Sequence, residues 1–296
     1  MTWRRYSVAV LRSLRLHQWV KNALVFVPLM LGGRALDISV WADASIGFVA
    51  FGLTASGTYI VNDLRDRAYD QAHPMKRHRP VANGELSQTA AIVLATTCLL
   101  AGLAIGLWIG FDEFTILMIY LTLTVAYTFW LKRLPVVDVF TIATFFSLRL
   151  AFGVVLSDVR WSPWLFVLSM CAFLSLALAK RFAELSGSRT GAALSGRGYV
   201  LADLPFIRGL GLAAATTAVL IVILYLIEEA FPHALYDHPQ RLWAAPVILF
   251  LFFGRIWIAA ERGELSEDDP VAFALMDRTC LFYGLCLLLD FVAAVV

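Results

Sequence analysis

The stretch Tyr59–Pro80 reads "YIVNDLRDRAYDQAHPMKRHRP" and joins an apolar run to a dense cluster of charge. Its three aspartates, Asp63, Asp66 and Asp70, follow one another at spacings of three and four residues. On one helix these spacings place the carboxylates on one face, a turn apart, where like charges repel. The arrangement therefore needs positive charge close by, either a divalent cation or neighbouring arginines.

The composition of the chain is that of a membrane protein. Of its 296 residues, 60% are hydrophobic and 16% are charged, and the mean hydropathy is +0.76. Soluble domains are about 45–50% apolar and about 25% charged. The four cysteines lie in apolar runs, without the spacing of a zinc site or a redox pair. We expect one transmembrane domain over residues 1–296, which begins with a basic interfacial segment and not a signal peptide.

Apolar stretches long enough to approach or span a bilayer predict nine transmembrane helices and an all-α integral membrane fold. They cover residues 23–36, 42–62, 88–110, 113–131, 135–156, 162–180, 206–229, 242–259 and 271–295. The first stretch is short and contains Pro28 and the Gly32-Gly33 pair, so its ends are the least well defined.

Basic residues are distributed unevenly between the loops of this arrangement. With the N-terminus in the cytosol, the cytosolic segments hold 20 of the 24 Lys and Arg residues, and the opposite loops hold three. Such a bias orients membrane proteins with the basic loops inside. We therefore expect the N-terminus and the active site on the cytosolic side of a bacterial cytoplasmic membrane, where the long polar loops lie.

The aspartate cluster predicts a magnesium site. Mg²⁺ prefers oxygen ligands and is held by one or two carboxylates together with water and substrate phosphates. Asn62 adds an amide oxygen at the edge of the cluster. The structural alternative is a solvated acidic helix end held by local arginines. That alternative leaves the basic "HPMKRHRP" of residues 73–80 unexplained, whereas cations beside a metal site suit a diphosphate.

The stretch from Asn62 to Pro80 resembles the first aspartate-rich motif, NDxxDxxxD, of the UbiA superfamily of intramembrane prenyltransferases. The resemblance implies nine transmembrane helices around a central cavity that opens to the cytosol. It also implies that Mg²⁺ is held against a diphosphate leaving group by Asn62, Asp63, Asp66 and Asp70.

The loop after the sixth predicted helix departs from this pattern. Typical members carry a second aspartate-rich motif there, but this chain reads "LALAKRFAELSGSRTGAAL" at residues 176–194, with no pair of aspartates. Together with "QWVKN" at 18–22, "GELSEDDP" at 263–270 and "LMDR" at 275–278, this loop is similar to one branch, the decaprenyl-phosphate phosphoribosyltransferases of the mycobacterial cell-wall pathway.

That branch implies transfer of 5-phosphoribose from 5-phosphoribosyl-1-diphosphate to a polyprenyl phosphate, with release of pyrophosphate. The reaction needs cations for three phosphate groups, but no catalytic base, because the second pKa of a phosphate monoester is about 6. We expect no nucleic-acid partner, and a homo-oligomer stays open. The candidate substrate-binding residues are Lys21, Asn22, Asn62, His73, Lys76, Arg79, Tyr127, Arg149, Lys180, Arg181, Glu184 and Arg189.

Two other functions compete with this interpretation. One is transfer of a prenyl group from a prenyl diphosphate to an aromatic acceptor, against which the basic "KRFAEL" argues. The other is transport without catalysis, which would favour interrupted helices at matching positions in two halves of the chain. The sequence has no such pair of segments, and its charge cluster lies at the end of an apolar run.

Two further charged sites allow more than one interpretation. Arg149 is the one charge deep in a predicted helix, and such a charge commonly faces a site or forms an ion pair between helices. Asp138 lies eleven residues earlier, too far away to pair with it directly. Asp268 and Asp269 precede Pro270, where they either start a helix or form a second metal site.

Overall fold

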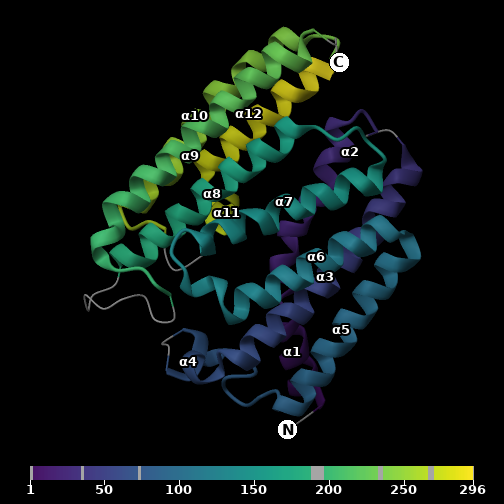
Figure 1. The fold of residues 1–296 in the computed structure, drawn as a ribbon, viewed down its shortest axis with the longest axis vertical. Coiled ribbons are helices and arrows are strands. Elements are labelled where there is room, and N and C mark those ends of the chain that lie inside the picture. The colour runs from purple at the N-terminus through teal and green to yellow at the C-terminus, as the bar shows by residue number, and fades with distance from the viewer. Residues whose placement is uncertain are drawn as a thin grey trace. The chain divides into compact units, whose positions relative to one another are not determined.

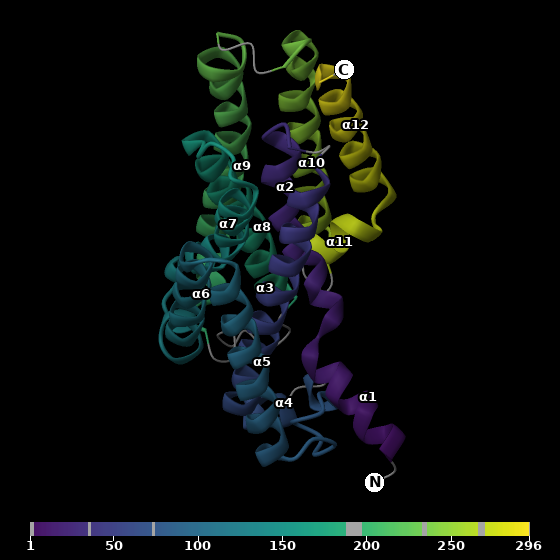
Figure 2. The ribbon, with the colours of Figure 1, turned by 90° about the vertical axis from the view of Figure 1, so that its right-hand side faces the viewer.

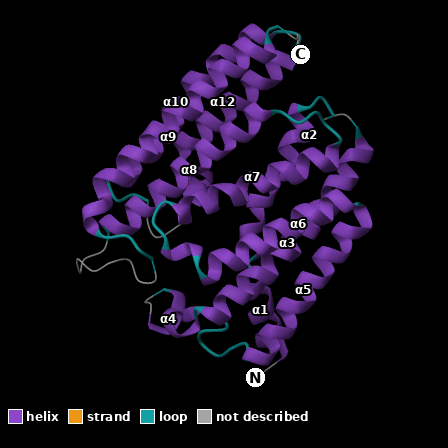
Figure 3. Cartoon of the chain, viewed as in Figure 1, coloured by secondary structure: helices purple, strands orange, loops and turns teal. Residues whose placement is uncertain are grey.

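The computed structural model describes residues 3–34, 37–72, 75–187, 197–232, 236–265 and 270–295. Within these ranges the chain is helical and forms no strand (Figure 3). It divides into two compact units, each built from two segments of the chain. The first unit comprises Met1–Leu131 and Leu148–Trp161, and the second comprises Lys132–Ser147 and Ser162–Val296. The all-α expectation is therefore confirmed for the described residues.

The first unit is built around its longest helix, α3 (Figure 1). The α-helices of this unit are α1 (Trp3–Leu14), α2 (Val27–Leu31), α3 (Ile38–Arg65), α4 (Arg67–Ala72), α5 (Gln88–Ile109) and α6 (Phe111–Phe129). The 3₁₀ segments are η1 (Leu16–Phe26) and η2 (Lys76–His78). Asp37 caps α3, and its side chain accepts hydrogen bonds from the backbone N–H and the hydroxyl of Ser39.

Helices α3 and α5 approach each other closely because glycines line their interface. A Cβ atom on Gly102 of α5 would lie 2.8 Å from the carbonyl oxygen of Ala50 on α3. A Cβ atom on Gly57 of α3 would lie 3.0 Å from the carbonyl oxygen of Ala95 on α5. Such small-residue contacts are typical of helices packed within a membrane. This packing fixes the helix whose last turn carries the first aspartates.

The second unit is a row of packed helices. Its elements are the first half of α7 (Val137–Ser157), α8 (Pro163–Ser186), α9 (Leu204–Tyr225), the π-helical turn η5 (Leu226–Ala230), α10 (Ala244–Glu261), α11 (Pro270–Met276) and α12 (Arg278–Val295). Helix α9 packs on α8, and α10 lies between α9 and α12 (Figure 2). Trp257 of α10 reaches α8, where its indole N–H donates to the Ser175 hydroxyl over 3.0 Å.

Seven helices in the described ranges are long and apolar enough to cross a membrane, by length and composition. They are Ile38–Arg65, Gln88–Ile109, Val137–Ser157, Pro163–Ser186, Leu201–Ala230, Pro239–Glu261 and Arg278–Val295. All seven overlap predicted spans. The predicted total of nine is not confirmed, nor is a central cavity open to the cytosol.

Three predicted spans differ from the structure for identifiable reasons. Of the predicted span 23–36, residues 23–31 form the end of η1 and the five-residue α2, because Pro28 lies in the first turn of that helix and Gly33 follows it with a φ of +74°. Helix α6 carries Asp112 and Glu113 in its first turn and is not among the seven. The predicted helix 271–295 breaks at Asp277, whose carboxylate accepts the Cys280 N–H and so begins α12.

Candidate active site

The first aspartate motif spans two helices and not one. Asn62 and Asp63 lie in the last turn of α3, Asp66 ends that helix with φ −93° and ψ 8°, and Asp70 lies in the short α4. The chain turns at Asp66, so the three carboxylates do not lie along one straight helix face. Asp63 and Asp70 are buried, with 2% and 4% of their surface exposed. Asp66 is partly exposed.

Two arginines neutralise the buried carboxylates. One guanidinium nitrogen of Arg79, Nη1, donates to Oδ1 of Asp63 over 3.0 Å and to Oδ2 of Asp70 over 2.7 Å. Arg15 donates to the same Asp63 oxygen over 2.5 Å. Breaking a buried ion pair by removing one partner is costly, since the other charge is left uncompensated. Arg79, predicted as a substrate contact, therefore serves here as the counter-ion that joins the two aspartates.

The N-terminal helix supplies a site residue that the sequence analysis did not predict. Arg15 ends α1 in the left-handed conformation, with φ 51° and ψ 48°. Its guanidinium lies over the ring of Tyr59, 5.4 Å from the centroid, and reaches Asp63. Arg12, one turn earlier, donates to Glu85 and to the carbonyl of His78. The basic composition of this segment indicated only an anchor on the cytosolic side.

A second buried polar group in the first unit joins η1 to α7. Arg149 donates from Nε to Oδ1 of Asn22 over 2.8 Å, and both residues are buried. The guanidinium also lies over the rings of Phe51 and Tyr120, 4.8 and 5.3 Å from their centroids. The amide nitrogen of Asn22 is buried without a hydrogen-bond partner. The structure thus brings together two predicted substrate-binding residues, Asn22 and Arg149.

Of the remaining predicted site residues, Lys76, Lys21 and Tyr127 lie in described elements of the first unit. Lys76 belongs to η2, and its carbonyl accepts the Arg79 N–H over 3.0 Å. Lys21 precedes the buried Asn22 in η1, and Tyr127 lies in the last turn of α6. His73, Arg189 and the pair Asp268 and Asp269 lie outside the described residues.

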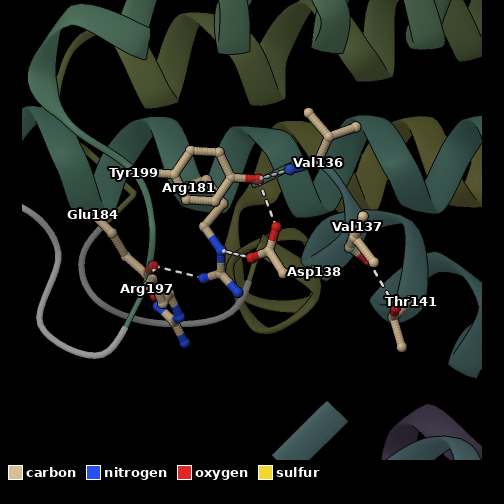
Figure 4. A network of polar contacts seen from close by, with 8 residues as sticks. All are labelled: Val136, Val137, Asp138, Thr141, Arg181, Glu184, Arg197 and Tyr199. Atoms are coloured by element: carbon tan, nitrogen blue, oxygen red, sulfur yellow. Dashed lines mark hydrogen bonds and ion pairs between the residues drawn. The ribbon is translucent and has the colours of Figure 1, made fainter. Parts of the chain in front are cut away.

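The "KRFAEL" segment of α8 forms a buried ionic network in the second unit (Figure 4). Arg181 donates from Nε to Oδ2 of Asp138 over 2.7 Å and from Nη1 to Oε2 of Glu184 over 2.6 Å. The side chains of Arg181 and Asp138 are 1% and 0% exposed. Arg197 donates to the same Glu184 oxygen over 2.5 Å. Arg181 and Glu184 are predicted to bind substrate. In the structure each forms ion pairs with side chains of opposite charge in the same unit.

Tyr199 extends this network to a strained turn. Its hydroxyl donates to Oδ1 of Asp138 over 2.5 Å and accepts the backbone N–H of Val136 over 2.7 Å. Val136 has a φ of +68°, which is unfavourable for a β-branched residue. Burial and the bond to Asp138 raise the pKa of Tyr199, so its phenol remains a donor at neutral pH. The network thus holds the turn before α7 against the end of α8.

The carboxylate pair of the first unit suits a magnesium ion. The bonded oxygens of Asp63 and Asp70 both lie within 3.0 Å of one cationic nitrogen, so the fold already places a positive charge between them. Two buried carboxylates that converge in this way match the sites where Mg²⁺ also takes substrate phosphates. Throughout the described ranges, no group of three or more His, Cys, Asp or Glu residues is arranged to hold a metal. A magnesium site at Asp63 and Asp70, with Asn62 and Asp66 as further ligands, therefore stays a prediction.

Comparison with known proteins places the chain in a family. Residues 23–282 match the UbiA prenyltransferase family. The chain belongs to this family, and it is an integral membrane protein with several apolar helices. The expected resemblance is thereby confirmed.

Individual relatives show how far the similarity extends. An uncharacterized protein of Sinorhizobium fredii, y4nM, is 41% identical over 96% of this chain, which spans 55% of that relative's length. The decaprenyl-phosphate phosphoribosyltransferase of Mycolicibacterium smegmatis is 34% identical over 91% of this chain and 86% of its own length. A solved structure of a UbiA homolog from Archaeoglobus fulgidus, bound to GPP and Mg²⁺, superimposes with a TM-score of 0.70 at 15% identity, over 96% of this chain and 97% of that chain.

Proposed function

We propose that this chain transfers the 5-phosphoribosyl group of 5-phosphoribosyl-1-diphosphate to a polyprenyl phosphate and releases pyrophosphate. The proposal rests chiefly on the similarity to the Mycolicibacterium smegmatis decaprenyl-phosphate phosphoribosyltransferase over 91% of the chain. The buried carboxylates of Asp63 and Asp70 beside two arginines support it, because the reaction must stabilise a departing diphosphate.

The bonds that change in this reaction suit the residues of the first unit. The bond from ribose C1 to the diphosphate oxygen breaks, pyrophosphate takes its electron pair, and C1 forms a bond to an oxygen of the acceptor phosphate. Asp63 and Asp70 would hold Mg²⁺, which when bound neutralises charge on the leaving pyrophosphate. The acceptor phosphate is largely deprotonated at neutral pH, so no side chain needs to remove a proton.

The phosphate groups that the metal does not contact need cations from the protein. Lys76 lies in η2, three residues before the Arg79 that joins the carboxylates, which makes it a candidate for the donor. In the second unit Arg181 is already neutralised by Asp138 and Glu184. We propose Lys180, which precedes Arg181 on α8, as a candidate for a substrate phosphate in that unit.

The charge distribution supports a placement of the site on the cytosolic side of the membrane. Asp63 lies at the end of an apolar helix of 28 residues, beside the basic segments that predict the cytosolic side. We propose that the site faces the cytosol of a bacterium, where a soluble phosphoribosyl donor is available. The acceptor chain would remain in the bilayer.

Substitution of the motif aspartates tests this function. We expect Asp63→Asn and Asp66→Asn to abolish turnover of 5-phosphoribosyl-1-diphosphate, and EDTA to do so in the unmodified protein. Because Asp63 also carries two ion pairs, each variant is checked for its melting temperature in detergent. Asp66 is partly exposed and its substitution should leave folding intact. Near-normal turnover in both folded variants would overturn the metal-dependent mechanism.

A further inference from the structure

The buried charges at the end of α3 form a neutral set. Asp63 and Asp70 contribute two negative charges, and Arg15 and Arg79 contribute two positive charges. Both arginines bond the same Asp63 oxygen, and Arg79 uses one nitrogen for both carboxylates. The fold therefore places two arginine charges of its own against this carboxylate pair.

This arrangement places Arg79 where a divalent cation would bridge the carboxylates. A metal that bound alone would have to displace Arg79 Nη1 from both aspartates and leave its guanidinium without these two carboxylate partners. A metal that arrives with a diphosphate brings anionic oxygens, which can accept the displaced guanidinium groups in bidentate pairs. Metal and diphosphate should therefore bind cooperatively. The metal frees the guanidinium groups from the carboxylates, and the diphosphate oxygens then pair with those guanidinium groups.

The two arginines are built to remain near the site after such an exchange. Arg15 is held at its backbone, since Ser56 of α3 donates to the carbonyl of Leu14 over 2.7 Å and accepts from the indole of Trp19. A left-handed arginine is strained and persists only where its surroundings fix it. The side chains of Arg15 and Arg79 are 20% and 27% exposed, so both guanidinium groups border on solvent while the carboxylates do not.

We infer that Arg15 and Arg79 are exchangeable counter-ions, which neutralise Asp63 and Asp70 in the empty enzyme and pass to the phosphate oxygens of the donor when a metal takes the carboxylates. The inference rests on the proposed function, since it assumes that this site receives a metal and a diphosphate. It assigns a substrate-binding role to Arg15. It also makes the metal site selective for a metal–diphosphate complex over the free metal.

Binding of Mn²⁺, followed by the loss of its free-ion EPR signal, tests the inference without turnover. Mn²⁺ replaces Mg²⁺ at oxygen sites, and methylenediphosphonate serves as an unreactive diphosphate. For the unmodified protein we expect weak Mn²⁺ binding alone and binding about 10-fold tighter with methylenediphosphonate, an ordinary coupling between ligands. For Arg79→Gln we expect Mn²⁺ alone to bind about 10-fold tighter than to the unmodified protein, and the diphosphonate to add little.

Two further variants make the result specific. Arg77→Gln changes an exposed arginine of η2 in the same loop and should bind Mn²⁺ like the unmodified protein. Arg15→Gln removes the other counter-ion and should shift Mn²⁺ binding in the same direction as Arg79→Gln. It keeps the test decisive if Arg79→Gln does not fold. Formation of the Mn²⁺–diphosphonate complex in solution is common to all samples that contain diphosphonate, so it cancels when variants are compared, and a protein-free titration corrects the comparison with Mn²⁺ alone.

The possible outcomes separate the inference from the proposed function. If Asp63→Asn abolishes Mn²⁺ binding, but the arginine variants bind Mn²⁺ and show the diphosphonate effect as the unmodified protein does, the exchange is refuted and the metal site stands. If Asp63→Asn binds Mn²⁺ as well as the unmodified protein, with and without diphosphonate, no metal uses this carboxylate. Both the inference and the proposed mechanism then fail.

Discussion

Removal of Arg181 should destabilise the protein before it alters substrate binding. The side chains of Arg181 and Asp138 are almost fully buried, and the Nε to Oδ2 distance is 2.7 Å. Arg181→Gln leaves the Asp138 carboxylate with the Tyr199 hydroxyl but without its buried counter-charge. Breaking a buried pair in this way costs roughly 3–5 kcal/mol. At about 2–4 °C per kcal/mol, the melting temperature should fall by roughly 6–20 °C.

Thermal unfolding in detergent, followed by tryptophan fluorescence, measures this effect. Arg208→Gln is the matched control, because the Arg208–Glu261 pair spans 3.4 Å between exposed side chains and should contribute at most about 1 kcal/mol. The double variant Asp138→Asn/Arg181→Gln should lose less stability than the two single losses combined, since the charges compensate each other. A melting temperature within about 2 °C of the unmodified protein, together with weakened substrate binding, would refute the structural role and make Arg181 a substrate contact.

Two more variants probe the same region. Tyr199→Phe removes the hydroxyl between Val136 and Asp138. The same unfolding measurement should show a loss of stability of about 1–3 kcal/mol, which is expected when a buried polar group is left unsatisfied. An unchanged melting temperature would show that the strained turn does not depend on this hydroxyl. Lys180→Ala should raise KM for the donor or for the polyprenyl phosphate while the melting temperature stays constant, and unchanged KM values for both substrates would exclude Lys180 from phosphate binding.

Much of the helical architecture could be predicted from hydropathy and helix signals. Seven predicted spans overlap helices that are long and apolar enough to cross a membrane, because about 20 apolar residues are required for that purpose. The breaks were harder to place. Asp277 lies in an apolar run, yet it ends the helical path because its carboxylate bonds both the Cys280 N–H and Arg255 of α10. The second of these contacts is tertiary.

The charged groups of the candidate site can be predicted from the sequence, but their pairing cannot. The spacing of Asp63, Asp66 and Asp70 indicated one helix face, whereas the chain turns at Asp66, and Arg79 bonds both Asp63 and Asp70. The contact of Arg15 could not be predicted, because it depends on a left-handed turn and on the packing of α1 against α3. Arg15 and Asp63 are 48 residues apart in the sequence.

The pairing of Arg181 shows the same limit in the second unit. Its contact with Glu184, three residues on along α8, follows from helix periodicity. Its contact with Asp138, 43 residues earlier in the chain, depends on the packing of α7 against α8 and has no local signal. For this reason a segment that the sequence analysis interpreted as a set of substrate cations proved to contain a neutralised arginine.

The identity of the donor tests the proposed function most directly. Purified protein in detergent with Mg²⁺ is given radiolabelled 5-phosphoribosyl-1-diphosphate and a polyprenyl phosphate, or, in a parallel reaction, a prenyl diphosphate and 4-hydroxybenzoate. We predict a labelled, lipid-soluble product in the first reaction and no prenylated aromatic in the second. A prenylated aromatic in the second reaction, with no labelled lipid in the first, would contradict phosphoribosyl transfer.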